Sequence, residues 1–224
     1  MHGAAGVSCT TARACPGCKP REIPLINAVE RAALDVLVTE LGWPRALRVA
    51  ASVRWQTFRC QPFGHLPPPT DKRERGSRAQ AGDAIRLLRA LRTVLGEEEA
   101  RRITRRVIRT SALTFLDRAI GELGPDSLDG LSPSQRDEQV RAHLDRFPNV
   151  TASLTEASEE RVRFDVTRCR LVELTHAAGE PSLAHVFCSS DAAFFASKGL
   201  RLDRPSTLAD GADACRFDIR GRGA

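Results

Sequence analysis

The chain has no tyrosine, few aromatic residues and only three lysines, Lys19, Lys72 and Lys198, among its 224 residues. No apolar run approaches the ~20 residues that a membrane-spanning helix needs. Residues 1–20 also lack a basic stretch followed by an apolar one, which argues against a signal peptide. We therefore expect a cytoplasmic protein that has no membrane partner.

Arginine carries nearly all of the positive charge. Lys and Arg number 34 against 28 Asp and Glu, so the formal net charge is +6. The arginines are scattered among acidic residues, and no tyrosine is present on which bases could stack, so we expect no nucleic-acid partner. A nucleic-acid-associated protein, the alternative, would bind with steep salt dependence. We interpret the densest arginine group as a solvated helix face; it comprises Arg101, Arg102, Arg105, Arg106 and Arg109.

Three of the seven cysteines lie near the N-terminus. In a reducing compartment, cysteines are more often thiols or metal ligands than disulfides. Cys15 and Cys18 form a CxxC pair, and Cys9 lies close by, in a segment without periodicity that covers residues 1–22. A zinc knuckle would need a second ligand pair nearby. We therefore interpret this segment as a flexible tail.

Residues 23–148 read as a helical scaffold, because their apolar residues recur at helical spacing. Pro-rich residues 60–70 are predicted to form a loop, and the charged residues 72–78 are expected to be exposed. The predicted helices cover residues 24–41, 43–58, 79–95, 97–120 and 133–147.

At Asn149 the apolar period changes from helical to alternating, which predicts a β-hairpin over residues 150–166. We then predict a helix capped by Thr167 and ending near Ala178, a second helix from Pro181 to Ser197, and further short strands near residues 200–202 and 214–219. The predicted fold is α+β, with a helical N-terminal half followed by a small antiparallel sheet and two packed helices. Residues 149–220 would form the α+β region, integrated with the scaffold in one domain.

The second predicted helix of this region carries a thiol between two titratable groups. His185, Cys188 and Asp191 are spaced i, i+3, i+6 and span an arc of roughly 120°. An imidazole beside a thiol can stabilise a nucleophilic thiolate. The structural alternative is that Cys188 packs as a small apolar side chain beside Phe187 and Phe195.

Cys169 is a rival nucleophile. Following Thr167, it is expected in the first turn of its helix, where the helix dipole and Arg168 would depress the pKa of the thiol. Cys215 shares a strand face with Phe217 and is expected to be buried. Three cysteines with His185 or Asp191 could instead bind zinc, but their spacings match no compact zinc motif. We therefore predict no metal.

Two arginines flank this stretch and could hold an anion. A guanidinium binds a carboxylate through two parallel hydrogen bonds, so Arg168 and Arg204 are candidate ligand-binding residues. Thr207 and Gly211 could shape a polar loop that approaches the ligand. Turn chemistry around Pro205 is the alternative reading of Arg204 and Thr207.

Three motifs in this stretch resemble a known family. They are F-x-V-T-R-C over residues 164–169, F-C-x-x-D over residues 187–191, and R-x-x-T-L-A-x-G-x-x-x-C-x-F over residues 204–217. Their order and spacing resemble the L-2-amino-thiazoline-4-carboxylic acid hydrolase family, over about residues 151–217. The tail and the Pro-rich loop lie outside the resemblance.

The resemblance implies hydrolytic opening of a small cyclic amidine that carries a carboxylate, without a redox cofactor. The namesake reaction converts L-2-amino-thiazoline-4-carboxylate to N-carbamoyl-L-cysteine. On this reading Cys188 is the nucleophile, Asp191 or His185 the acid/base, and Arg168 the carboxylate ligand. Cys169 or Cys215 would line the pocket.

Two other functions stay open. A member of this family could act on another ring in a biosynthetic pathway of secondary metabolism, by ring formation, addition or elimination. A ligand- or metal-sensing domain without catalysis would bind its ligand even after its cysteines were alkylated. Exposed faces of the N-terminal helices could also pair subunits in a homo-oligomer.

Overall fold

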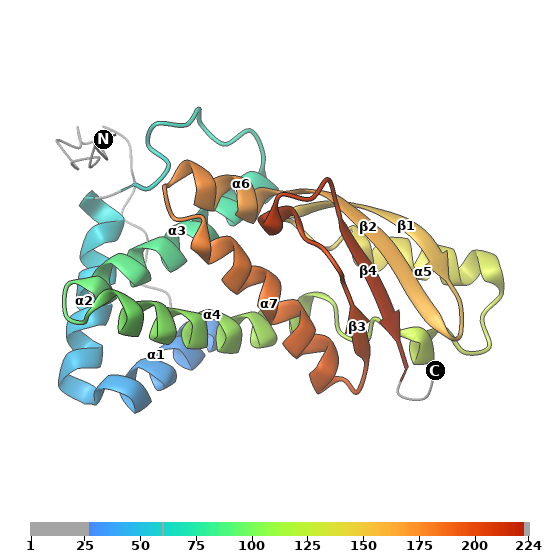
Figure 1. The fold of residues 1–224 in the computed structure, drawn as a ribbon, viewed down its shortest axis with the longest axis horizontal. Helices are drawn as coiled ribbons and strands as arrows, with labels where there is room; N and C mark the ends of the chain where they lie inside the picture. Colours follow the sequence, from blue (N-terminus) through green and yellow to red (C-terminus); the bar gives the residue numbers. More distant parts are fainter. Residues whose placement is uncertain (1–26, 60, 222–224) are drawn as a thin grey trace.

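The computed structural model describes residues 27–59 and 61–221, so the predicted tail with Cys9, Cys15 and Cys18 lies outside the described residues. The fold is α+β, as predicted, with helices and a four-stranded sheet side by side (Figure 1). The helices are α1 Ala28–Leu41, α2 Trp43–Arg59, α3 Lys72–Arg92, α4 Glu97–Ala119, α5 Pro133–Leu144, α6 Arg170–Ala177 and α7 Ser182–Ser197. The strands are β1 Val150–Ala157, β2 Arg161–Cys169, β3 Arg201–Asp203 and β4 Cys215–Arg220, and short 3₁₀ helices cover Pro125–Leu128 (η1) and Leu208–Asp210 (η2).

Side-chain caps mark the starts of helices α1 and α3. At α1, Asn27 accepts a hydrogen bond from the Glu30 N–H, and the Glu30 carboxylate accepts one from the Asn27 N–H. At α3, the Asp71 carboxylate accepts from the Glu74 N–H at 2.6 Å. The third helix therefore begins at Lys72 rather than at Ala79, because Asp71 satisfies an N–H group that would otherwise have no partner.

The early start of α3 also buries a residue that we expected to be exposed. Ser77 is fully buried, and its hydroxyl donates to the Asn149 side chain at 2.6 Å. Asn149 in turn donates to the Gln80 side chain at 2.8 Å. These bonds tie α3 to the residue that precedes β1.

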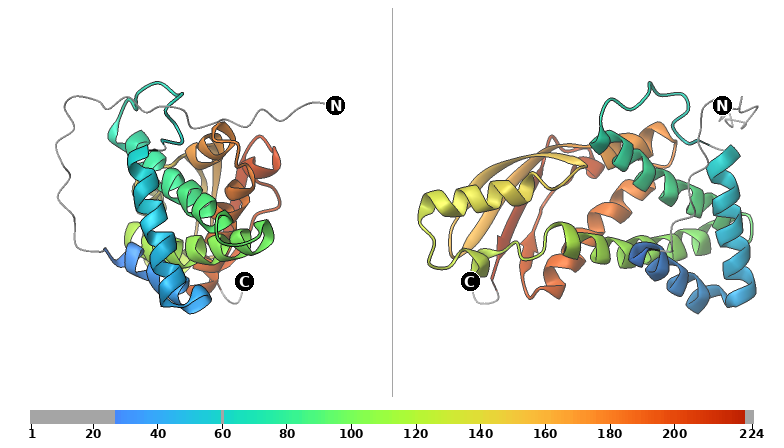
Figure 2. Two further views of the ribbon diagram at one scale, coloured as in Figure 1. Left: turned by 90° about the vertical axis from the view of Figure 1, so that its left-hand side faces the viewer. Right: turned by 180° about the vertical axis from the view of Figure 1, so that it is seen from behind.

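The sheet is antiparallel, with strand order β1-β2-β4-β3. Its apolar face buries Val162 and Ile219, and the Phe164 and Phe217 rings stack with centroids 4.5 Å apart. Helix α5 lies along β1 and covers one side of the sheet, which is seen from behind in Figure 2. On the opposite face, Arg161 pairs with Asp218 at 2.5 Å. Apolar and charged side chains therefore alternate along the strands, as expected for a sheet that is covered on one face.

Two hydrophobic cores meet along α4 and α7. One lies among the N-terminal helices and includes Ile103 of α4 and Val186 of α7. The other lies against the sheet and includes Ile120, just after α4, and Phe194 of α7. The middle of α7 is therefore located at the junction of the two halves of the molecule (Figure 1).

Candidate functional site

Cys188 lies in the middle of α7, between Val186 of the helical core and Phe194 of the sheet core. Its side chain is half-buried. Asp191 follows three residues later, so it lies on the same side of the helix about one turn along. The helix thus presents a thiol and a carboxylate together at the junction of the two cores.

Arg204, in the loop after β3, connects this pair to the sheet. Its guanidinium donates to the Asp191 carboxylate at 2.7 Å and to the Cys188 carbonyl oxygen at 2.7 Å. It also lies over the Phe217 ring, 4.9 Å from the centroid. The Arg204 side chain is only 10% exposed. A guanidinium held by three different partners is fixed in position, and it orients Asp191.

Cys169 is the last residue of β2 and the N-cap of α6, so the cap of this helix is Cys169 and not Thr167 as predicted. Strand pairing continues past a register shift at Thr167 to the pairs Thr151–Arg168 and Val150–Cys169, so Thr167 and Arg168 belong to the strand. Burial raises the pKa of the Cys169 thiol and outweighs the N–H groups of Val172 and Leu171, which lower it as a helix start should. The expectation of a depressed pKa was wrong because it left out desolvation.

Cys215 begins β4 and is buried, as expected from its strand face. Its sulfur accepts a hydrogen bond from the Leu208 N–H at 3.1 Å. Thr207 caps η2: its hydroxyl accepts a hydrogen bond from the Asp210 N–H at 3.2 Å and donates one to the Asp210 carboxylate at 2.7 Å. Gly211 follows at φ 84°. The positive φ suits glycine at this turn. The loop that carries Arg204, Thr207 and Gly211 is thereby fastened to the start of β4.

The five residues Cys169, Cys188, Cys215, Asp191 and Arg204 form what we call the thiol site. They lie close enough to affect one another's ionisation. Besides burial, the Asp191 carboxylate raises the pKa of each thiol, and the Arg204 guanidinium lowers the pKa of Cys188 and of Cys215. Burial is the largest effect and raises the pKa of Cys188 to about 12. Burial also raises the pKa of Asp191, against the opposing effect of Arg204. At neutral pH the site therefore holds protonated thiols.

His185 and Arg168 lie outside this cluster of contacts. The His185 side chain is 54% exposed, and its Nδ1 lies 3.4 Å from the Asp210 carboxylate. The exposed Arg168 guanidinium donates two hydrogen bonds to Glu173, at 2.6 and 2.9 Å. Each residue is one to three positions from a cysteine of the thiol site, but its polar partner is a surface carboxylate.

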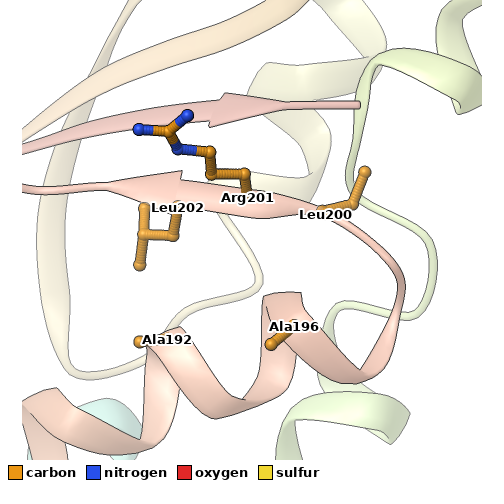
Figure 3. A pocket seen from close by; sticks show the side chains of 5 residues that line it. All are labelled: Ala192, Ala196, Leu200, Arg201 and Leu202. Atoms are coloured by element: carbon orange, nitrogen blue, oxygen red, sulfur yellow. The ribbon is translucent and has the colours of Figure 1, made fainter. Parts of the chain in front are cut away.

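A cavity of about 380 Å³ opens between α7 and β3 (Figure 3). It is lined by Ala192, Ala196, Leu200, Arg201 and Leu202. Ala192 directly follows Asp191, but no residue of the thiol site lines the cavity. It is therefore separate from the thiol site.

The thiol site does not resemble a metal site. Within residues 27–59 and 61–221, no three His, Cys, Asp or Glu side chains are arranged to hold a metal ion. Among the helices of the same segments, none combines the length and hydropathy needed to cross a membrane.

The sequence reasoning selected the cysteines and Asp191 but missed their connections. It treated Arg204 as a ligand-binding residue and did not pair it with Asp191, thirteen positions away. It also missed Glu173 and Asp210 as partners of Arg168 and His185. The sequence held little signal for the first pair: Asp191 is the only carboxylate of α7, and Arg204 lies in the loop that follows the next strand.

Comparison with known proteins tests the resemblance carried by the three motifs. The family model for L-2-amino-thiazoline-4-carboxylic acid hydrolase matches residues 75–219, which is more than half of the chain and includes the whole thiol site. Searches of curated proteins and of solved structures found no match. The family name implies a hydrolase. The resemblance is confirmed, and the chain belongs to the L-2-amino-thiazoline-4-carboxylic acid hydrolase family.

Proposed function

We propose that this protein is a hydrolase that opens a small cyclic amidine carboxylate of the thiazoline type, with Cys188 as the nucleophile. One observation carries the proposal: the motifs of the family converge, from β2, α7 and the loop before β4, on one half-buried group of three thiols, a carboxylate and a guanidinium. Cys188 is the thiol whose own turn of helix supplies the carboxylate.

The proposed reaction begins with attack of the Cys188 sulfur on the ring carbon between sulfur and nitrogen. A new C–S bond forms, the ring C–S bond breaks, and the departing sulfur takes up a proton. The substrate is then attached to the enzyme as an isothiourea. Water attacks the same carbon and releases the Cys188 thiol, leaving a urea. The sum is substrate plus one water, and no electron is transferred.

A sulfur nucleophile suits this leaving group. The first step exchanges one C–S bond for another of the same kind, so little free energy separates the ring from the enzyme adduct. The difficult step, hydrolysis at an amidine carbon, is thereby divided into two easier ones.

The raised pKa of Cys188 means that the thiolate must form after the substrate binds. An amidine is protonated at neutral pH, and its positive charge next to Asp191 and Cys188 would stabilise the thiolate. Asp191 is the group that can accept the thiol proton and return it to the departing sulfur, with Arg204 holding it in place. His185 is the alternative acid/base. It would have to leave Asp210 to take this role.

Binding of the substrate carboxylate is assigned to Arg168, next to Cys169. Its guanidinium would exchange the Glu173 carboxylate for that of the substrate, with the same bidentate geometry. Thr207, Gly211 and Cys215 would shape the opposite wall of the site. No cofactor is needed for any of these steps.

Release of thiol tests the proposal. The purified protein is incubated with L-2-amino-thiazoline-4-carboxylate, and new free thiol is followed with a colorimetric reagent, after correction for the protein's own cysteines. We expect time-dependent thiol release that is lost in Cys188→Ala and retained in the matched variant Cys60→Ala, whose cysteine precedes the family match that begins at residue 75, provided that both variants are folded by circular dichroism. A folded wild-type protein that releases no thiol would refute the namesake reaction. It would shift the proposal to another ring substrate or to a binding role.

A further inference from the structure

Helix α2 exposes an apolar surface that the fold does not use. Among the described residues, the large hydrophobic side chains that are exposed all belong to α2. They are Trp43, Leu47, Trp55 and Phe58, with exposed fractions of 59, 55, 58 and 70%. At 100° per residue these four side chains lie within an arc of roughly 120°. We call this surface the outer face of α2.

The outer face is distinct from the face that α2 packs against the protein. Ala46 and Val49 are buried in the helical core, and they lie on the opposite side of the helix. Helix α2 is therefore apolar on two sides. In a monomer in water, the outer face of α2 buries no apolar surface and so does not stabilise the fold. Clustered, exposed aromatic side chains of this kind mark a binding surface for a partner.

The charge of α2 indicates the nature of that partner. Residues 43–59 contain four arginines and no aspartate or glutamate; the arginines are Arg45, Arg48, Arg54 and Arg59. Two of the guanidinium groups lie over the exposed rings, Arg59 at 4.4 Å from the Trp55 centroid and Arg54 at 5.8 Å from that of Phe58. An apolar face bordered by arginine complements a surface that is apolar inside and negatively charged at its rim.

The position of α2 leaves this face open. The helix crosses one end of the molecule, as Figure 1 shows, and it runs across the front when that end faces the viewer in Figure 2. It also precedes residue 75, where the match to the family begins. The outer face is thus at the opposite end from the sheet and does not contribute to the thiol site.

We propose that α2 binds the surface of an anionic phospholipid bilayer. The helix would lie in the plane of the membrane, with Trp43, Trp55 and Phe58 at the boundary between headgroups and acyl chains and the arginines on the phosphates. Such binding needs no membrane-spanning helix, so the lack of a long apolar run, from which we expected no membrane partner, does not argue against it.

A second copy of this chain is a poorer occupant. Pairing the outer faces of two copies would bring two sets of arginines together without a carboxylate on either helix. Repulsion between them would oppose the gain from burying the aromatic rings. An anionic bilayer supplies both the apolar and the negatively charged component.

Intrinsic fluorescence tests the proposal, because Trp43 and Trp55 are the only tryptophans and the chain has no tyrosine. The full-length protein is titrated with vesicles of phosphatidylcholine containing phosphatidylglycerol, and separately with vesicles of phosphatidylcholine alone. We expect a blue shift of the emission and protection from acrylamide with the anionic vesicles only. Both effects should weaken as salt is added.

Variants identify the residues responsible. In the double variant Arg48→Gln/Arg54→Gln, whose arginines lie on or beside the outer face, each substitution should weaken partitioning to anionic vesicles by about fivefold. Phe58→Ala keeps both tryptophans as reporters and should weaken it by about tenfold or more. The control Arg141→Gln/Arg146→Gln removes two exposed arginines, one on α5 and one just after it, and should leave binding unchanged because α5 lies at the other end of the molecule from α2 (Figure 1).

Three results would overturn the proposal. One is unchanged emission with anionic vesicles. Another is a blue shift that appears without lipid as the protein concentration rises, together with a doubled mass, which would assign the face to a second copy. The third is a shift with polyglutamate but not with vesicles, which would assign it to an acidic protein.

Discussion

The Arg204 guanidinium and the Asp191 carboxylate are 2.7 Å apart, across the gap between the loop after β3 and the middle of α7. The same guanidinium donates to the carbonyl oxygen of Cys188. Arg204 thereby sets the distance between the loop and the helix turn that carries the proposed nucleophile and its acid/base. The site depends on this contact both for its geometry and for the ionisation of Asp191.

Replacing Arg204 should change the pH dependence of the reaction. The Arg204→Gln variant loses the charge that lowers the pKa of Asp191, so the pKa of this carboxyl should rise further. Because Asp191 must be ionised to accept the thiol proton, the acidic limb of the kcat/KM profile should move to higher pH. Loss of the charged hydrogen bonds should also lower the free energy of unfolding by about 2 kcal/mol. If the acidic limb of the kcat/KM profile stays in place in a folded Arg204→Gln variant, either Asp191 is not the acid/base or Arg204 does not control its pKa.

His185 distinguishes the two acid/base assignments. It is exposed and lies beside Asp210, so His185→Asn should leave kcat within about threefold of the wild type if Asp191 transfers the proton. Asp191→Asn should lower kcat by at least about 100-fold. These values are measured by thiol release under saturating substrate. A larger loss of kcat in His185→Asn than in Asp191→Asn would identify His185 as the acid/base.

Arg168 and Glu173 offer a matched pair of variants. If Arg168 binds the substrate carboxylate, Arg168→Gln should raise KM by about tenfold or more with little change in kcat. Glu173→Gln frees the same guanidinium from its competitor and should lower KM by a few-fold at most, since exposed ion pairs are weak. Steady-state kinetics measure both. If both variants keep the wild-type KM, the substrate carboxylate is bound elsewhere.

Burial of Cys188 should appear in the stability of the protein at high pH. The folded-state pKa of about 12 lies above that of an unfolded thiol, about 8.5. The protonated thiol therefore favours the folded state. This contribution is complete below about pH 8.5 and is lost as the pH rises towards 12.

Cys188→Ser should consequently lose less stability than the wild type between pH 8 and pH 10, in urea unfolding followed by circular dichroism. Other groups that titrate in this range are common to both proteins, so the difference between the two slopes isolates Cys188. Parallel slopes would mean that the thiol is better solvated than the structure indicates.

The sequence predicted the fold class and most of the elements because apolar periodicity and glycine or proline positions are local signals. The α7 helix, the hairpin and the strand that carries Cys215 and Phe217 were all predicted from spacing. The start of α3 was missed because the charged residues after Asp71 suggested exposure. The buried bond between Ser77 and Asn149 depends on a partner more than seventy residues away.

The candidate site was predictable as a location but not as a set of pKa values. Helix position alone gave a low pKa for Cys169. In the structure, burial against the helical core raises the pKa of Cys169, and this effect exceeds the opposing effect of two N–H groups. Desolvation depends on the packing of distant segments, which spacing along one helix cannot reveal. The pairing of Asp191 with Arg204 depends on the same packing.

The assignment of Cys188 as the nucleophile is tested by trapping the adduct. The protein is mixed with L-2-amino-thiazoline-4-carboxylate, quenched in acid within milliseconds to seconds, digested and analysed by mass spectrometry. The account predicts that the peptide containing Cys188 gains the full mass of the substrate, that the adduct forms and decays at rates consistent with turnover, and that Cys188→Ala shows neither adduct nor thiol release. An adduct on the Cys169 peptide, or undiminished turnover in Cys188→Ala, would contradict it.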